Sequence, residues 1–343
     1  MLHKITHMRK EVAEIPEAIQ RFLTLSGGAA GEAAEALKLK NPALIATIGR
    51  GSSDHAATFL KYAIELYAGV PVASLGPSIA SIYGAKLRLH SAATISVSQS
   101  GESPDIVAMA RMAKQGGALC FALTNNPASP LARSADHAVD IVAGPELSVA
   151  ATKTFVSSIV AGLSVLAAWQ DDNALQRALA DLPGHAAQAL NCEWSPLAEA
   201  LDNNNSLYVL GRGPSWAIAQ EAALKLKETC SLHAEAYSSA EVMHGPVELV
   251  AGAFPVLALC ARDAAEQSSV EAAEKIGDSG ARVFLTSRLA RNSTRLPFAA
   301  TGHPLTDALC LVIPYYVFVE AYSRSLGLNP DSPARLNKVT QTR

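Results

Sequence analysis

Residues 95–103 read Ile-Ser-Val-Ser-Gln-Ser-Gly-Glu-Ser, at the end of an apolar run that begins at Ala92. The run predicts a buried strand, and residues 105–114 have the pattern of a helix. A strand that ends in a serine- and glycine-rich turn before a helix can bind phosphate, because backbone N–H groups and the helix dipole face the anion. Such a turn is also typical of plain helix capping. Three hydroxyls in six residues (Ser98, Ser100 and Ser103) favour the phosphate site.

Segments of two kinds alternate around this stretch. Short apolar runs predict strands, and longer patterned stretches predict helices. The strands are expected at 43–48, 72–75, 92–97, 119–123 and 138–142, and the helices at 8–24, 56–67 and 152–169. This alternation predicts an α/β fold, in which a doubly wound parallel sheet is covered by helices on both faces.

The chain repeats itself after about half its length. Residues 207–215 (LYVLGRGPS) echo residues 45–53 (IATIGRGSS), 162 positions earlier, and further strands are expected at 255–259 and 282–285. The repeat predicts two tandem α/β domains, residues 1–190 and 191–343.

The second copy differs from the first at the phosphate-binding turn. The positions of residues 98–101 and Ser103 are taken by residues 260–263 (CARD) and Ala265, so the hydroxyls are lost and an acidic residue appears. A carboxylate repels a phosphate. We therefore expect one phosphate site per chain, in the first domain, with a different task for the second domain.

The motif Gly49-Arg50-Gly51 after a strand also suggests a dinucleotide-binding turn. That fingerprint needs a third glycine, where this chain has Asp54, and an acidic residue after the next strand, which is missing. Ser52 and Ser53 at the start of a helix are better interpreted as a second set of anion ligands that face residues 98–103. A simple N-cap would explain one of these serines but not both.

Composition narrows the classes of function. With 28 basic and 31 acidic residues the chain shows no basic stripe for nucleic acid. The N-terminus has no secretory apolar region, and we expect no apolar run long enough to span a membrane. Five scattered cysteines, odd in number, indicate buried thiols in a reducing cytoplasm and not disulfides.

An acid–base cluster is predicted in the second domain. Glu221, Lys225 and Glu228 are spaced by four and three, which places them on one helix face. The alternative is a solvated ladder of ion pairs, but the apolar neighbours favour partly dry surroundings in which a carboxylate can exchange protons. His244, before Gly-Pro in a polar-rich loop, is a second acid–base candidate.

Two other features are less distinctive. The triplet His233-Ala-Glu has no third ligand at zinc spacing, so a metal is not expected. The tail 329–340 lacks periodicity and on its own suggests a frayed end, in which Lys338 is unremarkable.

Five ordered motifs resemble the double sugar isomerase (SIS) domain family. They are SQSGES, GPELSVAATK (144–153), EAALKLKE (221–228), HAEAYSSAEVMHGP (233–246) and PARLNKVT (333–340). The chain resembles the isomerase half of glucosamine-6-phosphate synthase and, in the SSAE and NPDSPARLNKVTQT stretches, the stand-alone type II glucosamine-6-phosphate deaminases. The resemblance implies two flavodoxin-like SIS domains with flanking helices.

The same resemblance implies a role for each matching position. Glu228 would move the proton between C1 and C2, and Lys225 would support the site. His244 from a neighbouring subunit would assist ring opening, and Lys338 would reach the carbonyl carbon. Substrate contacts are implied at Ser52, Ser53, Ser98, Gln99, Ser100, Ser103, Val149, Ala151 and Glu221.

The chain departs from the synthase at two positions. Residue 2 is Leu2 where the synthase has its nucleophilic cysteine, and residue 151 is Ala151 where the synthase has a serine. We therefore expect no glutaminase activity, and one substrate hydroxyl contact in doubt.

The sequence predicts a cytoplasmic glucosamine-6-phosphate deaminase that needs no cofactor and forms fructose 6-phosphate and ammonia. We expect a homodimer whose active site is shared between the subunits. The alternatives are another aldose–ketose isomerase of sugar phosphates, a fructosamine-6-phosphate deglycase, and a non-catalytic sugar-phosphate sensor. We expect no nucleic-acid or membrane partner.

Overall fold

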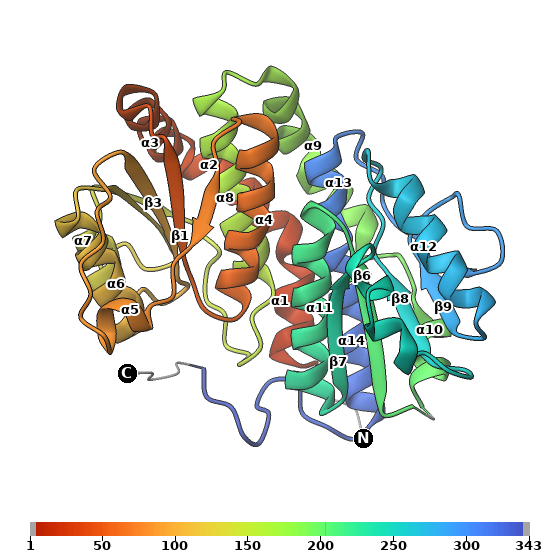
Figure 1. Cartoon of the computed structure of the whole chain (residues 1–343). Coiled ribbons are helices and arrows are strands. Elements are labelled where there is room, and N and C mark those ends of the chain that lie inside the picture. The colour runs from red at the N-terminus through yellow and green to blue at the C-terminus, as the bar shows by residue number, and fades with distance from the viewer. Residues whose placement is uncertain (1–4, 203, 339–343) are drawn as a thin grey trace. The chain divides into compact units, whose positions relative to one another are not determined.

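The computed structural model describes residues 5–202 and 204–338 (Figure 1). Leu2 therefore lies outside the described residues. Contacts divide the chain into two units, each described by itself below. The β1–β5 unit holds residues 14–146, 151–180 and 337–338, and the β6–β10 unit holds 5–13, 147–150 and 181–336. The domain boundary at 190/191 stays a prediction.

The β1–β5 unit is built on a parallel sheet of five strands in the order β2-β1-β3-β4-β5. The strands are β1 (Leu44–Ile48), β2 (Val72–Ser74), β3 (Ala92–Val97), β4 (Leu119–Thr124) and β5 (His137–Asp140). All six residues of β3 are buried, as expected of a central strand covered on both faces. The strand order changes direction between β1 and β3, which makes that position the switch point of the sheet.

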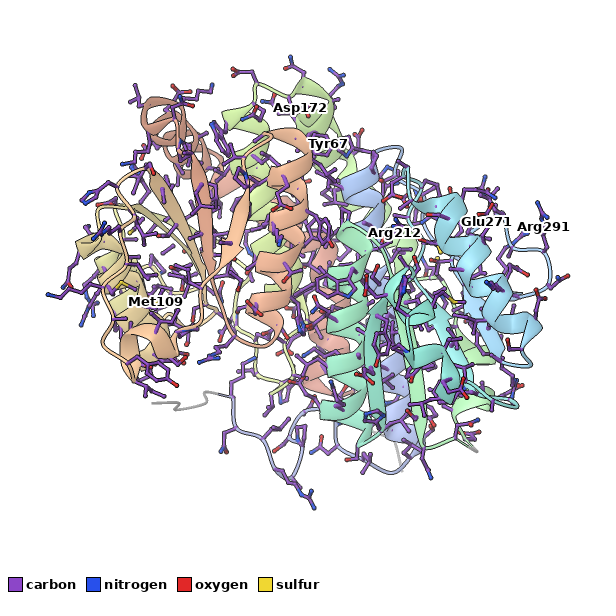
Figure 2. The ribbon with its side chains drawn as sticks, viewed as in Figure 1. Tyr67, Met109, Asp172, Arg212, Glu271 and Arg291 are labelled. Carbon is purple, nitrogen blue, oxygen red and sulfur yellow. The ribbon has the colours of Figure 1, made fainter. Side chains whose placement is uncertain are left out.

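Helices cover both faces of this sheet. On one face lie α4 (Ser52–Tyr67) and α8 (Lys153–Trp169), with α2 (Ile15–Leu25) and α3 (Gly27–Lys40) packed against α8. On the other lie α5 (Ser78–Ser81), α6 (Pro104–Gln115) and α7 (Pro130–Ser134) (Figure 1). Met109, labelled on α6 in Figure 2, is fully buried in the core of that second face.

The β6–β10 unit has a second parallel sheet in the order β7-β6-β8-β9-β10. Its strands are β6 (Ser206–Gly211), β7 (His233–Ser238), β8 (Pro255–Ala258), β9 (Arg282–Leu285) and β10 (Thr294–Arg295). In chain order this is the strand order of the first sheet. The predicted fold class, two doubly wound parallel sheets with flanking helices, is confirmed.

The helices of the β6–β10 unit also form two layers. α11 (Pro214–Cys230) packs on β6 and β7 and is covered by α13 (Pro304–Cys310) and α14 (Val312–Ser325), and α1 (His7–Ala13) packs on α14. α12 (Glu266–Asp278) packs on β8 and β9, and Glu271, labelled on it in Figure 2, is exposed. The remaining elements are α10 (Ser195–Leu201), the 3₁₀ turns η1 (Glu241–Met243) and η2 (Pro246–Leu249), and α9 (Asn173–Ala189), whose residues are divided between the units.

One expectation about apolar segments is wrong. The stretch Pro304–Ser325, which contains α13 and α14, has 22 residues and is apolar enough to cross a membrane by length and composition. In the folded protein, 89% of the most apolar 18-residue part of this stretch is buried. A helix that is apolar on all sides and buried by its own protein is a core helix, and this stretch packs on α11 within the β6–β10 unit.

Three local predictions need correction. The helix expected at 8–24 is two helices, α1 and α2, which meet at Glu14. Pro16 explains the break, because proline lacks the N–H that a continuous helix would use and suits the first turn of α2. The polar-rich stretch after residue 232 begins with a strand, β7, and α4 begins at Ser52, four residues earlier than predicted. Helix α3 was not predicted.

Candidate functional site

The predicted phosphate ligands lie at one edge of the first sheet. β1 and β3 are parallel neighbours, with Ile48 paired to Ser96, so their carboxyl ends meet at the same edge. Residues 49–53 follow β1, residues 98–103 follow β3, and α4 and α6 begin there. The structure thus places Ser52, Ser53, Ser98, Gln99, Ser100 and Ser103 around the switch point. In open α/β sheets ligands bind at that position.

The turn after β3 is held in one conformation by its own hydroxyls. Ser98 Oγ accepts a hydrogen bond from the Gly101 N–H at 3.1 Å, and Ser100 Oγ accepts one from the Glu102 N–H at 3.2 Å. Gly101 has φ of +64°, and a Cβ there would lie 2.2 Å from Ser129 Oγ, so only glycine fits. Ser98 is buried, whereas Ser100 and Ser103 are partly exposed and can meet a ligand.

The next strand also supports this turn. The Asn125 N–H and Thr124 Oγ1 both donate to the Gln99 carbonyl, at 3.1 and 3.3 Å, and the Leu131 N–H donates to the Gly101 carbonyl at 3.1 Å. These bonds fix the turn before any ligand arrives, which lowers the entropy cost of binding. Sequence reasoning missed these supports because β4 ends in no recognisable motif.

An arginine joins the two serine-bearing turns. Arg50 contacts the fully buried carboxylate of Asp105 in the first turn of α6, with both its Nε and a terminal nitrogen 3.1 Å from Oδ2. Half of the Arg50 side chain stays exposed, so a positive charge stands beside the serines. Burial raises the pKa of Asp54, and His55 and Arg50 only partly oppose this. The positive charge of Arg50 reduces repulsion of an anion.

The predicted tail lysine has a buried partner. Lys338 Nζ lies 3.0 Å from Glu146 Oε2, and the Glu146 side chain is fully buried. The same carboxylate accepts hydrogen bonds from the Thr152 and Thr154 N–H groups at 3.0 and 3.1 Å and from Thr154 Oγ1 at 2.7 Å. Ala151 directly precedes Thr152 and is partly exposed. Glu146 is a residue that sequence reasoning missed, although it lies within the GPELSVAATK motif.

The loop that carries Val149 is held from α1 and from the tail. In the β6–β10 unit, the Glu11 carboxylate accepts hydrogen bonds from the N–H groups of Leu147 and Ser148 and from Ser148 Oγ. The Val149 N–H donates to the Asp331 carbonyl at 3.0 Å. The Asp331 carboxylate in turn caps α1, accepting from two backbone N–H groups of its first turn at 2.8 Å. The tail before Lys338 is therefore anchored, and not a frayed end.

The acid–base residues form a row on α11 that runs from the core to the surface. Lys225 Nζ lies 3.3 Å from Glu221 Oε1 and 2.5 Å from Glu228 Oε2. The side chains of Glu221 and Lys225 are fully buried, and that of Glu228 is 21% exposed. Tyr316 of α14 donates a hydrogen bond to Glu221 Oε1 at 3.0 Å. Only the Glu228 end of the row reaches solvent, so the row is not a solvated ladder.

The buried lysine in this row carries a charge. Burial acts to lower the pKa of Lys225, but the negative charges of Glu221 and Glu228 and their hydrogen bonds outweigh burial and leave this pKa raised. An ammonium between two carboxylates leaves a net negative charge on the row, and Glu228 is the member that can offer it to a ligand.

His244 lies on an exposed turn of the β6–β10 unit. It follows η1, and its backbone N–H donates to the Glu241 carbonyl at 2.9 Å. The residue as a whole is exposed. Val242 beside it is buried in the core of the unit, so the turn is anchored while the imidazole faces outward. The prediction that His244 serves a neighbouring subunit needs this outward position.

The corresponding crevice of the second sheet is filled by the chain itself. Arg262, at the position of Ser100, bonds to Asp307 Oδ1 through Nε at 2.7 Å and to the carbonyls of Thr286 and Cys260 at 2.7 and 2.6 Å. Its guanidinium also lies 3.7 Å from the centre of the Phe298 ring. These contacts occupy the N–H donors of Arg262 that a bound anion would need.

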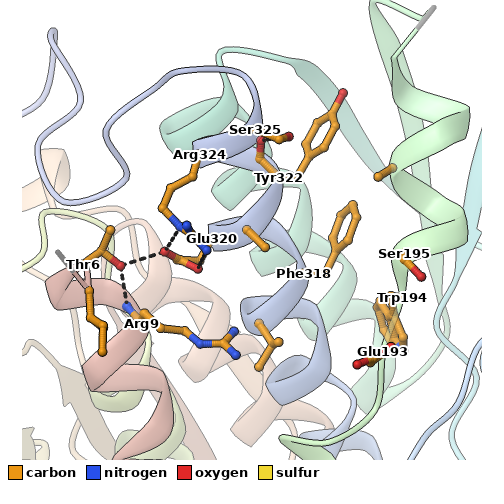
Figure 3. Close-up of a pocket in the computed structure, with 14 residues that line it drawn as sticks. Thr6, Arg9, Glu193, Trp194, Ser195, Phe318, Glu320, Tyr322, Arg324 and Ser325 are labelled. Carbon is orange, nitrogen blue, oxygen red and sulfur yellow. Dashed lines mark hydrogen bonds and ion pairs between the residues drawn. The ribbon is translucent and has the colours of Figure 1, made fainter. Parts of the chain in front are cut away.

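A separate cavity of about 650 Å³ lies in the β6–β10 unit (Figure 3). None of the predicted site residues lines it. On its wall the fully buried Glu320 accepts hydrogen bonds from Thr6 at 2.8 Å and from Arg324 at 2.7 Å. The charged groups of Glu320 and Arg324 thus pair with each other, and Thr6 ties the segment before α1 to α14. This cavity is therefore a weaker candidate than the serine crevice, by which we mean the edge of the first sheet that carries Ser52, Ser53, Ser98, Ser100 and Ser103.

Comparisons with known proteins agree on one family. The model of the SIS domain matches residues 38–168 and 200–292. The chain is 33% identical to the glutamine–fructose-6-phosphate aminotransferase (isomerizing) of Symbiobacterium thermophilum over 96% of its own length, and spans 58% of that protein.

Two solved structures are also similar. A protein proposed to be a phosphosugar isomerase from Silicibacter pomeroyi DSS-3 shares 53% identity, with a TM-score of 0.93 over 95% of this chain and 100% of that one. The C-terminal domain of the glucosamine-fructose-6-phosphate aminotransferase from Francisella tularensis shares 26% identity, with a TM-score of 0.85 over 96% and 99% of the two chains.

Proposed function

Because the chain belongs to the SIS domain family, we propose that it is an enzyme of the phosphosugar isomerase kind. In this proposal its substrate is glucosamine 6-phosphate, which it converts with water to fructose 6-phosphate and ammonia. The observation that carries the proposal is the row on α11, where Glu228 alone of three interacting charged groups reaches solvent. A carboxylate held in this way is suited to move a proton on a bound sugar.

The proposed chemistry begins with the open-chain aldose. Glu228 removes the proton at C2, which the neighbouring C1 carbonyl makes acidic, and the electron pair forms an enolamine. Glu228 then returns the proton to C1, while the C1 oxygen gains a proton and the amino nitrogen loses one, which leaves a C1 hydroxyl and an imine at C2. Water adds to this imine, ammonia leaves, and fructose 6-phosphate remains. The enzyme supplies position and charge stabilisation, so we expect no cofactor.

The serine crevice is the proposed phosphate and hydroxyl site. Ser100 and Ser103 offer hydroxyls, and Arg50 offers a positive charge nearby. Val149 and Ala151 remain predicted contacts of the substrate region. The prediction that Glu221 contacts the substrate needs correction, because its side chain is fully buried and its carboxylate faces Tyr316 and Lys225. Lys338 is proposed to approach the carbonyl carbon, with Glu146 as the buried carboxylate that receives its ammonium in the structure.

The proposed active form is a cytoplasmic homodimer. His244 is exposed, and in the proposal it enters the site of a neighbouring subunit to assist ring opening. If so, inactive H244A chains mixed with inactive E228A chains form hybrid dimers with one intact site, and part of the activity returns. Absence of any recovery, under conditions where labelled subunits exchange, would contradict the shared site.

Two other activities use the same parts. An aldose–ketose isomerase of sugar phosphates needs the same cradle and the same base, and a fructosamine-6-phosphate deglycase differs in the group attached to nitrogen. A sugar-phosphate sensor would need the crevice but not the row on α11. The intact row therefore favours an enzyme.

The deciding experiment is a substrate panel. Ammonia release is measured with glucosamine 6-phosphate and with fructosamine 6-phosphates, and ketose formation is measured with neutral aldose 6-phosphates. The proposal expects ammonia and fructose 6-phosphate in equal amounts from glucosamine 6-phosphate. Turnover of a neutral aldose phosphate alone would replace the deaminase by an isomerase, and binding without turnover of any member would indicate the sensor.

A further inference from the structure

Tyr316 of α14 extends the row on α11 at its buried end, through Glu221. Its hydroxyl donates to Glu221 Oε1 at 3.0 Å, and the same oxygen faces Lys225 Nζ at 3.3 Å. Tyr316, Glu221 and Lys225 are all fully buried. A buried carboxylate must be compensated by hydrogen bonds or charge, and Glu221 has both from these two neighbours.

We infer that Tyr316 is a positioning residue for the proton transfer, acting on Glu228 through Glu221 and Lys225. This rests on the proposed function. The Tyr316 hydroxyl stabilises the negative charge on Glu221. Charged Glu221 then draws part of the Lys225 ammonium toward itself, so that Glu228, 2.5 Å from the same nitrogen, is not fully neutralised. The base keeps enough negative charge to accept a proton.

Other titratable groups near α11 have partners of their own. Tyr315 of α14 donates to the Ala222 carbonyl at 2.5 Å, and Asp307 of α13 pairs with Arg262. Tyr208 of β6 and Tyr237 of β7 pack edge to face.

Three further groups on these elements and on α11 are also engaged: His233 with Ser206, Glu235 with Tyr237, and Cys230 with the Val319 carbonyl. The charges that act on Lys225 come from Glu221 and Glu228.

The chain offers a matched control for Tyr316. Tyr315 is the neighbouring residue of α14, is equally buried, and also donates its hydroxyl to α11. Its acceptor is a backbone carbonyl, whereas the acceptor of Tyr316 is the Glu221 carboxylate. Loss of either hydroxyl removes one hydrogen bond from a buried acceptor and lowers stability. Only loss of the Tyr316 hydroxyl changes the charge balance of the row.

The test compares Y316F with Y315F by steady-state kinetics over a range of pH. In Y316F the Glu221 charge is less stable, Lys225 is drawn more fully to Glu228, and Glu228 becomes a weaker base that is harder to protonate. We expect kcat to fall about tenfold, the size of a lost hydrogen bond to a charged group. The acidic limb of the kcat profile should move to lower pH while KM stays nearly constant. Y315F should keep the wild-type profile.

Two further variants make the test decisive. Y316Q restores a neutral donor and should return the acidic limb toward its wild-type position. E221Q should shift the limb in the same direction as Y316F, and the double variant should go no further than E221Q alone, because Tyr316 acts through Glu221. Equal profiles for Y316F and Y315F would overturn the inference. If Y316F does not fold, an unchanged acidic limb in E221Q overturns it.

The inference and the proposed function can fail separately. An E228Q variant that keeps wild-type turnover removes the base, and with it the proposed function. An inactive E228Q variant together with an unshifted Y316F profile keeps the proposed function and removes only the role of Tyr316.

Discussion

The two sheets share one strand order but differ in what stands at their switch points. Between β1 and β3 the chain presents partly exposed serines and a half-exposed arginine. Between β6 and β8 the position of Ser100 is taken by Arg262, whose donors are bound to Asp307 and to backbone carbonyls. A duplicated fold thus keeps its backbone, while the switch point of the first sheet carries partly exposed polar side chains and that of the second is occupied by an internally bonded arginine. In the proposed function the β6–β10 unit contributes instead through the row on α11.

The largest expected effect tests the unit that holds the row. The change Glu228→Gln keeps the size and hydrogen bonding of the side chain but removes the base. General-base catalysis is typically worth a factor of about 10² to 10⁴, and kcat should fall by that amount. Exchange of the substrate C2 proton with solvent deuterium should stop as well.

Binding in that variant should be preserved, because the proposed phosphate ligands belong to the β1–β5 unit. Calorimetric titration of E228Q with the sugar phosphate is the control. A variant with near wild-type turnover would show that Glu228 is not the base.

The next effect concerns the serine crevice. The double change Ser100→Ala and Ser103→Ala removes two proposed charge-assisted hydrogen bonds to phosphate, so KM should rise about 100-fold with a smaller change in kcat. The matched change Ala265→Ser, which adds a hydroxyl at the corresponding position of the second sheet, should leave KM unaltered. An unchanged KM in the serine variant would contradict the phosphate site.

The free energy of unfolding should depend on Arg262 at the switch point of the second sheet. The change Arg262→Ala leaves the buried carboxylate of Asp307 without its cation, and the free energy of unfolding should fall by about 3 kcal/mol in urea titrations. Arg50→Ala should cost less, because half of the Arg50 side chain is already exposed to water. If both variants lose the same free energy of unfolding, the two arginines are structurally equivalent.

The smallest effect is a pH dependence at the edge of the first sheet. Burial acts to raise the pKa of Asp136, but hydrogen bonds from Lys114 and the Cys120 N–H, with nearby positive charges, leave this pKa lowered. A carboxyl whose pKa is lower in the folded state stabilises the protein above its unfolded pKa of 3.8, and this stabilisation is lost as pH falls through the folded value.

The change Asp136→Asn should therefore lower stability at pH 7 by about 0.5 kcal/mol, because the pair is partly exposed. The difference from wild type should shrink as the pH drops below about 4. Thermal melts over that range measure it. A difference that grows in acid would reverse the assigned sign.

The sequence predicted the parts of the site that local patterns encode. The strand, turn and helix around Ser98 to Ser103 are contiguous, and the repeat identified the second sheet. Glu228 and Lys225 follow from helical spacing. β7 escaped prediction because its residues are mostly half-exposed and alternate weakly.

The residues that sequence reasoning missed act across long separations. Glu221 and its donor Tyr316 are 95 positions apart, and Lys338 and Glu146 are 192 apart. Glu11 and Ser148 are 137 apart. No periodicity links such pairs, since each depends on how helices and loops pack. The polar network that supports the candidate site therefore appears only with the fold.

The division of the chain into units has a consequence for protein engineering. The chain passes from one unit to the other between residues 13 and 14, 146 and 147, 150 and 151, 180 and 181, and 336 and 337. A single cut therefore cannot separate two self-sufficient halves. A fragment that ends near residue 190 would carry α1 without α14, the helix on which it packs. Chimaeras of this protein with a relative therefore need matched joints at all these positions.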